Sequence, residues 1–485
     1  MFVLIHTRER LSAVLAGAII CILAFATHLH AAEAPIAIPS DADAAANLTL
    51  DASTLRYSIQ GIGGNYVFGG LGSPITSYTL THLPLTYSRV QMLLENLQPF
   101  SDEKDLDAAA LRQITAMDTP GSALHQSLKI QAELARRKIP LIISIWRLPS
   151  WMYDAKSKGN ANGVADDKWP ALLAAIGRYL RYARDNYGSE PIALSFNEPD
   201  MGVHVKFTAE EHRLAIRRIG SHLAGMNLKT RMVLGDVVHP SGTIRYLKPT
   251  VDDPEALKYC AIVSFHSWGG ASPKEYALWP ELAGRLKLPL IVGEAGPNSR
   301  ALKDGSLKTP KLALAEMVHY QELFLYACPN AVIGWEYTPD FSLLEKDPAD
   351  PKRLLPNFRY ALQKHWTTFI PPGSQTLKTD SDQPSVLFTA FRTGNGTAAH
   401  YSLHISNAGP ARKANLSGLP SALKTLNVVR SELSRLFKPG PAVSVLNGAI
   451  SVDLPAESLT TLTTLDVPKL EDEVRSAPSS HSVSE

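Results

Sequence analysis

The stretch Ile192-Ala193-Leu194-Ser195-Phe196-Asn197-Glu198-Pro199 decides the expected fold of this 485-residue chain. Its first five residues form a mostly apolar run, as is typical of a strand that is buried on both faces of a parallel sheet. A second run, Pro289-Leu290-Ile291-Val292, leads in the same way into Gly293-Glu294. Parallel barrels carry functional side chains at the carboxyl ends of their strands. The two runs therefore predict an α/β barrel with two glutamates at one mouth.

The part of the chain between Ser58 and Phe369 continues this pattern, because short apolar runs alternate there with amphipathic helical stretches. The expected strands are Ile59–Val67, Leu85–Met92, Pro140–Trp146, Ile192–Phe196, Met232–Val237, Ala261–Phe265, Leu290–Val292 and Val332–Trp335. Eight strands of this kind predict a (β/α)8 TIM barrel, which we assign to residues 58–372.

The pattern changes after Pro371-Pro372-Gly373. Runs such as Val386–Phe391 alternate apolar and polar residues and are separated by Gly/Asn turns, which favours an additional C-terminal antiparallel β-sandwich domain at 373–467. The N-terminal segment 33–57 contains a strand-like stretch and could join that sandwich. The tail, 468–485, is charged and serine-rich, which is typical of disorder.

The first residues, 1–32, are typical of a signal peptide. Arg8 and Arg10 precede an apolar stretch, and small residues follow at Ala31 and Ala32. We therefore expect a secreted protein, extracellular or periplasmic, with no stable membrane insertion after cleavage. An uncleaved membrane anchor is the alternative, because about 17 apolar residues is the lower limit for spanning a bilayer.

Composition narrows the possible partners. The formal net charge is +2 and the hydrophobic fraction is 45%, so there is a large core and no basic character that would indicate nucleic-acid binding. After signal removal only Cys260 and Cys328 remain, and we expect both to be buried free thiols rather than a disulfide framework. No Cys/His cluster has metal-ligand spacing, so no metal and no cofactor are predicted.

The paired glutamates suit the cleavage of a glycosidic bond. A retaining hydrolase uses one protonated carboxyl to assist the leaving group and one ionised carboxyl to attack, about 5–5.5 Å apart. Asn197 supplies an amide suited to the sugar 2-hydroxyl, and Pro199 is expected to push Glu198 towards an extended conformation. The alternative is that Glu198 and Glu294 each end a strand by pairing with a lysine.

Several segments together carry a family resemblance. They are Gln60–Asn65, Tyr87–Val90, Ile145–Met152, Phe196–Asp200, Gly293-Glu294, Lys364–Gly373 and Leu454–Leu462. With them the chain resembles glycoside hydrolase family 30 of clan A over about residues 47 to 466. The resemblance implies a retaining β-glycosidase that takes an oligo- or polysaccharide or glycoside, with Glu198 as acid/base and Glu294 as nucleophile. It also implies that Arg89 lies beside Glu294 and keeps it ionised, although Arg89 could instead form an ion pair that braces the barrel.

Two loops depart from the family pattern and leave the substrate open. Arg147 stands where the family commonly has a Ser-Pro-Pro type sequence, and it could reach an anionic or hydroxyl-rich sugar or form a surface salt bridge. His266-Ser267-Trp268 stands where many clan A enzymes have a tyrosine that hydrogen-bonds the nucleophile. Trp268 can donate from its indole nitrogen. His266 could orient a substrate hydroxyl or the catalytic carboxyls, or be a core histidine.

Aromatic residues gather where strands end, and aromatic faces stack on the C–H faces of sugar rings. The candidate substrate-binding residues are Asn197, Arg89, Trp151, Trp268, His266, Trp335 and Tyr337. Asp236 and His239 end a strand on the same barrel face and could line subsites. Two other functions stay open: a different clan A activity such as xylosidase or arabinosidase, and a non-catalytic carbohydrate-binding protein. Sugar, linkage, exo or endo action and oligomeric state are not decided by the sequence.

Overall fold

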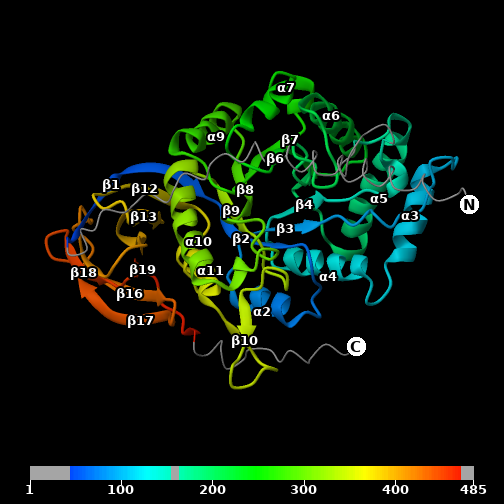
Figure 1. The fold of residues 1–485 in the computed structure, drawn as a ribbon. Coiled ribbons are helices and arrows are strands. Elements are labelled where there is room, and N and C mark those ends of the chain that lie inside the picture. The colour runs from blue at the N-terminus through cyan, green and yellow to red at the C-terminus, as the bar shows by residue number, and fades with distance from the viewer. Residues whose placement is uncertain (1–43, 155–162, 471–485) are drawn as a thin grey trace, which may run out of the picture. The chain divides into compact units, whose positions relative to one another are not determined.

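A closed barrel of eight parallel strands forms the larger part of the computed structural model, which describes residues 44–154 and 163–470 (Figure 1). The strands are β2 (Gly61–Tyr66), β3 (Tyr87–Gln91), β4 (Leu141–Ile145), β5 (Ala193–Phe196), β6 (Arg231–Val237), β7 (Cys260–His266), β8 (Leu290–Ala295) and β9 (Ala331–Gly334). Pairing of Gly61 in β2 with Ala331 in β9 closes the ring. The expected TIM barrel is thus confirmed, strand for strand.

Helices connect successive strands and surround the barrel (Figure 1). They are α2 (Pro74–His82), α3 (Leu106–Met117), α4 (Ala123–Arg136), α5 (Trp169–Tyr187), α6 (Ala209–Gly225), α7 (Lys248–Val251), α8 (Pro254–Leu257), α9 (Pro273–Leu286), α10 (Pro310–Glu322) and α11 (Phe358–Phe369). The starts of α6 and α9 are fixed by capping boxes, in which Thr208 and Ser272 exchange hydrogen bonds with the glutamates three residues on.

The inside of the barrel has an apolar layer with a polar layer above it. Alternate residues of a strand point to the same face, so inward-facing residues two positions apart in a strand belong to neighbouring layers. The apolar layer is Tyr87, Ile142, Ala193, Val233, Ile262, Ile291, Ala331 and Ile333. Two residues further along β3, β4 and β5, towards the carboxyl ends, come Arg89, Ser144 and Ser195, all buried. The strand period therefore places polar groups directly beneath the barrel mouth.

A nine-stranded sheet forms a second hydrophobic core, in the order β17-β16-β19-β14-β13-β12-β1-β15-β18. Its strands are β1 (Ala46–Ile59), β12 (Ser374–Ser381), β13 (Val386–Thr393), β14 (His400–Asn407), β15 (Arg412–Ser417), β16 (Thr425–Glu432), β17 (Arg435–Ser444), β18 (Ile450–Leu454) and β19 (Ser458–Thr463). The additional β-domain is confirmed as mostly antiparallel. One pair differs, since β1 runs parallel to β15 with Leu48 opposite Leu416. A small hairpin, β10 (Leu344–Lys346) with β11 (Leu354–Pro356), lies before α11.

This sheet packs against the last barrel helices. In α11, the ring of Phe369 stacks on Phe437 at 5.7 Å between centroids. His365 of the same helix lies between two hydroxyls of the sheet, 2.7 Å from Thr461 Oγ1 and 2.9 Å from Ser431 Oγ. Both apolar and polar groups are therefore buried between barrel and sheet, which makes the sheet a packing partner of the barrel.

Several expectations concern other parts of the chain. The predicted signal peptide, 1–32, lies outside the described residues, as does the predicted tail from 471 onward. Within the described ranges, none of the helices combines the length and apolar character needed to cross a bilayer. Cys260 and Cys328 are free thiols, as expected, but only Cys260 is fully buried, because Cys328 lies at the partly exposed end of the segment after α10.

Candidate active site

Glu198 and Glu294 meet at the carboxyl ends of their strands. Glu198 follows β5 and is 6% exposed, and Glu294 lies in β8 and is 3% exposed. One oxygen of each carboxylate and a ring nitrogen of His266 all lie within 4.8 Å of one another. Two buried carboxyls at this separation can approach a single anomeric carbon from opposite sides.

The backbone at Glu198 differs from the extended conformation expected before Pro199. Its φ is +46°, in the left-handed region that non-glycine residues rarely adopt. Two hydrogen bonds hold this turn: the Glu198 amide donates to the Asp236 carbonyl at 3.1 Å, and the Gly202 amide donates to the Glu198 carbonyl at 2.8 Å. Asp236 is itself left-handed, with φ +59°. Such backbone strain persists only where surrounding contacts impose it, and it concentrates at functional sites.

Arg89, in β3, connects the buried polar groups and is fully buried. One terminal nitrogen donates to Glu294 Oε1 at 2.8 Å and to Asn65 Oδ1 at 3.0 Å. The other donates to Asn197 Oδ1 and to Asp236 Oδ2, both at 2.8 Å. Because Arg89 occupies the amide oxygen of Asn197, the NH2 group of Asn197 is the part left to bind a ligand. The guanidinium thus lies beside Glu294, where the family resemblance places it, and also braces the barrel.

Trp268 contributes a second donor to Glu294. Its indole Nε1 donates to Glu294 Oε2 at 3.2 Å, while Arg89 donates to Oε1. Both oxygens of Glu294 therefore accept hydrogen bonds from N–H donors, an arrangement that suits a carboxylate.

His266 lies between three carboxylates. Nδ1 is 3.0 Å from Glu198 Oε1 and 3.3 Å from Glu294 Oε2, and Nε2 is 3.1 Å from Asp236 Oδ1. A ring nitrogen that faces a carboxylate oxygen must carry a proton to bond it, so this geometry favours the doubly protonated imidazolium. Burial acts to lower the pKa of His266, but the negative charges of Glu294 and Asp236 outweigh it and raise this pKa well above its usual value.

The surroundings of Glu198 and Asp236 shift the pKa values of these two carboxyls in opposite directions. Burial raises the pKa of Glu198, and the nearby Glu294 carboxylate adds to the rise. For Asp236 burial is outweighed by the charges of Arg89 and His266, which hold its pKa well below its usual range. Glu198 is therefore suited to keep a proton while Asp236 stays ionised, and such divergence between neighbouring carboxyls is typical of acid–base sites.

Metal binding is not favoured by this arrangement. Glu198, His266 and Glu294 form the one group of candidate ligands in the described ranges. Their ligand atoms already bond one another, and an imidazolium has no free lone pair to offer a cation.

Aromatic side chains surround the mouth above the carboxylates. Trp335, which follows β9, is half-buried, and its ring centroid lies 6.2 Å from that of Trp146 and 6.3 Å from those of Trp268 and Phe68. Trp335 is therefore the centre of an aromatic cluster and remains partly exposed. The Trp146 ring lies over Arg89, with 4.4 Å between its centroid and the guanidinium carbon.

Two predicted substrate-binding residues, Tyr337 and Trp151, have hydrogen-bond partners outside the group of carboxylates. Tyr337 is 1% exposed and donates from its hydroxyl to Gln363 Oε1 at 2.6 Å, so it packs between the barrel wall and α11 and cannot reach a substrate. Trp151 donates to the Leu97 carbonyl at 2.9 Å and is not in contact with the carboxylates. Both follow strand ends in sequence, but Tyr337 turns into the packing against α11, and the indole of Trp151 bonds to the loop after β3.

Sequence reasoning missed the polar groups that lie beneath the carboxylates. Ser195 and Ser264 donate to the two oxygens of Asp236, at 2.7 and 3.2 Å, and Ser144 accepts from Arg89 at 3.0 Å. The available signal was a serine inside each of three apolar runs, those of β4, β5 and β7, which a purely apolar strand would not contain.

Comparison with known proteins places this geometry in a known fold. No family model and no curated protein matches the chain. Among solved structures, a family 30 endoxylanase from Clostridium papyrosolvens C71 matches with a TM-score of 0.67 and 18% identity over 86% of this chain and 99% of that chain. A family 30 subfamily 8 xylanase from Clostridium acetobutylicum matches with a TM-score of 0.66 and 18% identity, over the same shares. An endo-β1,6-glucanase matches with a TM-score of 0.61 and 15% identity over 86% and 93%. The chain therefore has the barrel and side β-domain fold of family 30 glycoside hydrolases.

Proposed function

We propose that this protein is a secreted glycoside hydrolase that cleaves β-glycosidic bonds with retention of configuration. The observation that carries the proposal is the pair of buried carboxylates, Glu198 and Glu294, with oxygens within 4.8 Å of each other and in unlike environments. A separation of about 5–5.5 Å between carboxyl groups suits direct attack by one of them, whereas an inverting enzyme needs about 6.5–9.5 Å to admit a water.

In the first step a Glu294 oxygen forms a bond to the anomeric carbon. The bond from that carbon to the glycosidic oxygen breaks, and the oxygen takes the proton of Glu198 as it leaves. Since burial raises the pKa of Glu198, this residue holds the proton until it is needed. Arg89 and Trp268 hold the Glu294 carboxylate in position.

In the second step the Glu198 carboxylate removes a proton from water. The water oxygen then bonds to the anomeric carbon, the ester bond to Glu294 breaks, and Glu198 regains its proton. His266 serves both steps, because the negative charge moves from Glu294 to Glu198 and Nδ1 contacts both residues. The imidazolium can therefore stabilise the negative charge on either glutamate without a change in its own position.

We further propose a β-linked glycan as substrate. The free NH2 group of Asn197 is suited to the sugar 2-hydroxyl, and Trp335 offers a stacking face. The structures that share the fold include xylanases and a β1,6-glucanase, so β-xylans and β-glucans come first among the substrates to test.

The test is hydrolysis of aryl β-glycosides, β-xylans and β-glucans by the wild type, Glu198→Gln and Glu294→Gln. We expect each variant to lose at least about a hundredfold in kcat/KM on a polysaccharide that the wild type cleaves. Glu281→Gln, an exposed glutamate of α9, is the matched control and should retain full activity. A folded Glu294→Gln protein with activity near that of the wild type contradicts the proposal.

A further inference from the structure

The end of strand β8, which carries Glu294, is irregular along both of its edges. Its pairing with β7 shifts register between Phe265 and His266, and its pairing with β9 shifts between Val292 and Ala295. Such shifts disturb the backbone ladder that otherwise fixes the direction of a side chain, and they are frequent next to active sites. The ladder therefore does not by itself determine where the Glu294 carboxylate points.

Ser267, the first residue after β7, supplies hydrogen bonds at this irregular strand end. Its amide donates to the Glu294 carbonyl at 2.9 Å, and its hydroxyl donates to the same carbonyl at 3.3 Å. The Gly296 amide donates to Ser267 Oγ at 3.2 Å. Ser267 is fully buried and thus holds the backbone of β8 on both sides of Ala295.

His319, in α10, completes the arrangement around Ser267. Its Nε2 lies 2.7 Å from Ser267 Oγ. Since the one hydroxyl hydrogen of Ser267 is directed to the Glu294 carbonyl, Nε2 is the donor of this bond. Burial lowers the pKa of His319 to about 4, so the ring is neutral at neutral pH. His319 therefore acts on the strand end through geometry and adds no charge to the site.

The segment that begins with Ser267 also carries the indole that contacts Glu294. Trp268 donates from Nε1 to Glu294 Oε2 at 3.2 Å, and its carbonyl accepts from His239 Nδ1 at 2.7 Å. Its ring packs against Gly296, where a Cβ would lie only 2.6 Å from Trp268 Cζ3. The contacts of residues 267 and 268 thus determine how the indole lies relative to the carboxylate.

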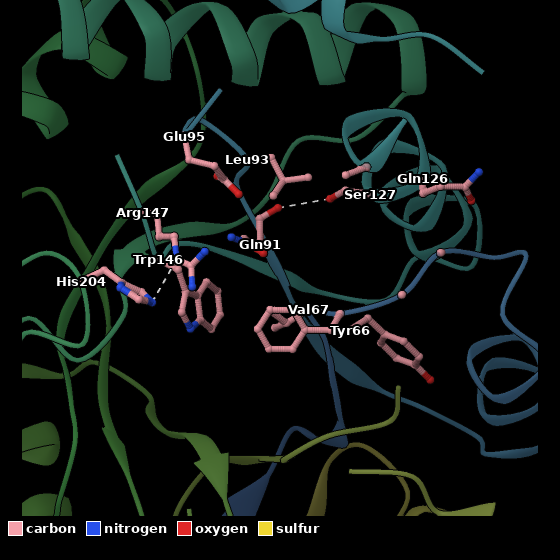
Figure 2. Close-up of a pocket in the computed structure, with 14 residues that line it drawn as sticks. Tyr66, Val67, Gln91, Leu93, Glu95, Gln126, Ser127, Trp146, Arg147 and His204 are labelled. Carbon is pink, nitrogen blue, oxygen red and sulfur yellow. Dashed lines mark hydrogen bonds between the residues drawn. The ribbon is translucent and has the colours of Figure 1, made fainter. Parts of the chain in front are cut away.

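Ser267 and His319 lie away from the open part of the barrel mouth. A cavity of about 390 Å³ opens beyond the ends of β2, β3 and β4, with Trp146 among its lining residues (Figure 2). Strand β7 lies across the barrel from β3, and Ser267 and His319 are at most 4% exposed. Neither residue can touch a ligand, so any effect that they have on catalysis passes through Glu294 and Trp268.

We propose that Ser267 and His319 are positioning residues for the nucleophile, which hold Glu294 and the Trp268 indole in the arrangement required for attack on the anomeric carbon. The inference rests on the proposed function and goes beyond it, because it assigns a role in the reaction to two residues that contact no substrate. A nucleophile must lie about 3–3.5 Å from the carbon that it attacks, so a small displacement of the strand end lowers the rate.

The experiment compares four variants with the wild type. Ser267→Ala removes the hydroxyl, His319→Leu removes the ring N–H, and His319→Gln restores an N–H donor in the place of Nε2. Gly296→Ala tests the same contact independently, because its Cβ displaces the Trp268 indole. Lys311→Ala, at an exposed position of α10, is the control.

Kinetics are measured well below each Tm, on the aryl β-glycoside that the wild type cleaves fastest. We expect Ser267→Ala, His319→Leu and Gly296→Ala to lower kcat and kcat/KM by about tenfold with KM unchanged. His319→Gln should stay within about threefold of the wild type, and Lys311→Ala should equal it. A purely structural role would lower the Tm and leave kcat intact, so a wild-type kcat in folded Ser267→Ala and His319→Leu proteins overturns the proposal. If His319→Leu does not fold, Ser267→Ala, which loses a single oxygen atom, decides the question.

Crystal structures of Ser267→Ala and His319→Leu test the arrangement without any need for hydrolysis. We expect Trp268 Nε1 to lie more than about 3.5 Å from Glu294 Oε2 in both, beyond hydrogen-bond distance. A contact that is unchanged in both variants overturns the proposal, whether or not the enzyme is active. Full activity of Glu294→Gln on the same substrate overturns the proposed function instead, because it removes Glu294 from the role of nucleophile.

Discussion

His266 Nε2 lies 3.1 Å from Asp236 Oδ1, so the imidazole that contacts both candidate catalytic glutamates is itself anchored by a buried carboxylate. Asp236 is in turn fixed by Arg89 at 2.8 Å and by Ser195 at 2.7 Å. The mouth of the barrel therefore contains one connected network, and each of its members affects the protonation of the others.

Replacing His266 by Gln should change the pH dependence of hydrolysis. His266 lowers the pKa of Glu198 through its hydrogen bond and its positive charge, in opposition to burial. Without it Glu198 keeps its proton to a higher pH, so the basic limb of the kcat/KM profile should move upward, while kcat falls because the carboxylates lose their shared donor. The variant His400→Gln, at an exposed position of β14 in the additional sheet, is the control and should keep the profile. A basic limb that does not move in His266→Gln would show that Glu198 is not the titrating acid.

Replacing Asp236 by Asn should destabilise the fold at neutral pH. The substitution leaves Arg89 with one carboxylate fewer in a buried site, at a cost of about 3 kcal/mol in the free energy of unfolding. Because the folded-state pKa of Asp236 is depressed, its contribution is fully present above the unfolded pKa of about 3.9 and is lost as the pH falls below it. Urea unfolding of both proteins should therefore show a large difference at pH 7 that narrows at pH 3. Asp252→Asn, an exposed control, should differ little from the wild type at either pH.

The variant Glu198→Gln should be more thermostable than the wild type at pH 8. The pKa of Glu198 is raised in the folded state by burial, so folding becomes less favourable as the pH rises above the unfolded value of about 4.3. Gln keeps an oxygen to accept from His266 and carries no charge. The difference in Tm should therefore be present at pH 8 and small at pH 4, as measured by differential scanning calorimetry. A lower Tm for the variant at pH 8 contradicts this account of the site.

A chain that ends after Pro372 should be insoluble or unfolded. Truncation exposes Phe369 of α11 and leaves His365 without the two hydroxyls that it bonds in the sheet. It also exposes Phe324, whose ring lies 5.4 Å from Phe391. Sedimentation and circular dichroism of the truncated protein test this expectation, and a soluble, active truncation would mean that the barrel folds without the sheet.

Much of the fold could be predicted from the sequence, because strand period and apolar runs are local signals. The runs that end at Glu198 and Glu294 predicted two neighbouring carboxyls, and both lie at one mouth. The conformation of Glu198 could not be predicted, because its left-handed backbone depends on hydrogen bonds to Asp236 and Gly202 that form only in the folded chain.

The direction in which side chains point after the end of a strand could not be predicted from the sequence either. Trp335 and Tyr337 stand two residues apart beyond the last barrel strand, yet Trp335 stays partly exposed at the mouth while Tyr337 turns inward to Gln363. The sequence positions of Trp335 and Tyr337 place both near the candidate site. The contact of Tyr337 with α11 is what directs its side chain away from the barrel mouth. Asp236 shows the reverse case: we expected it to line a subsite, but it is buried and pairs with Arg89 and His266, which both contact the candidate catalytic glutamates.

The most direct test of the assigned roles is the product formed by Glu294→Ala in the presence of azide. Small anions can enter the space of a removed nucleophile and attack the anomeric carbon from the same side. If Glu294 is the nucleophile and Glu198 the acid/base, proton NMR should show an α-glycosyl azide released from an aryl β-glycoside. A β-glycosyl azide from this variant, or hydrolysis at the wild-type rate without azide, contradicts the account.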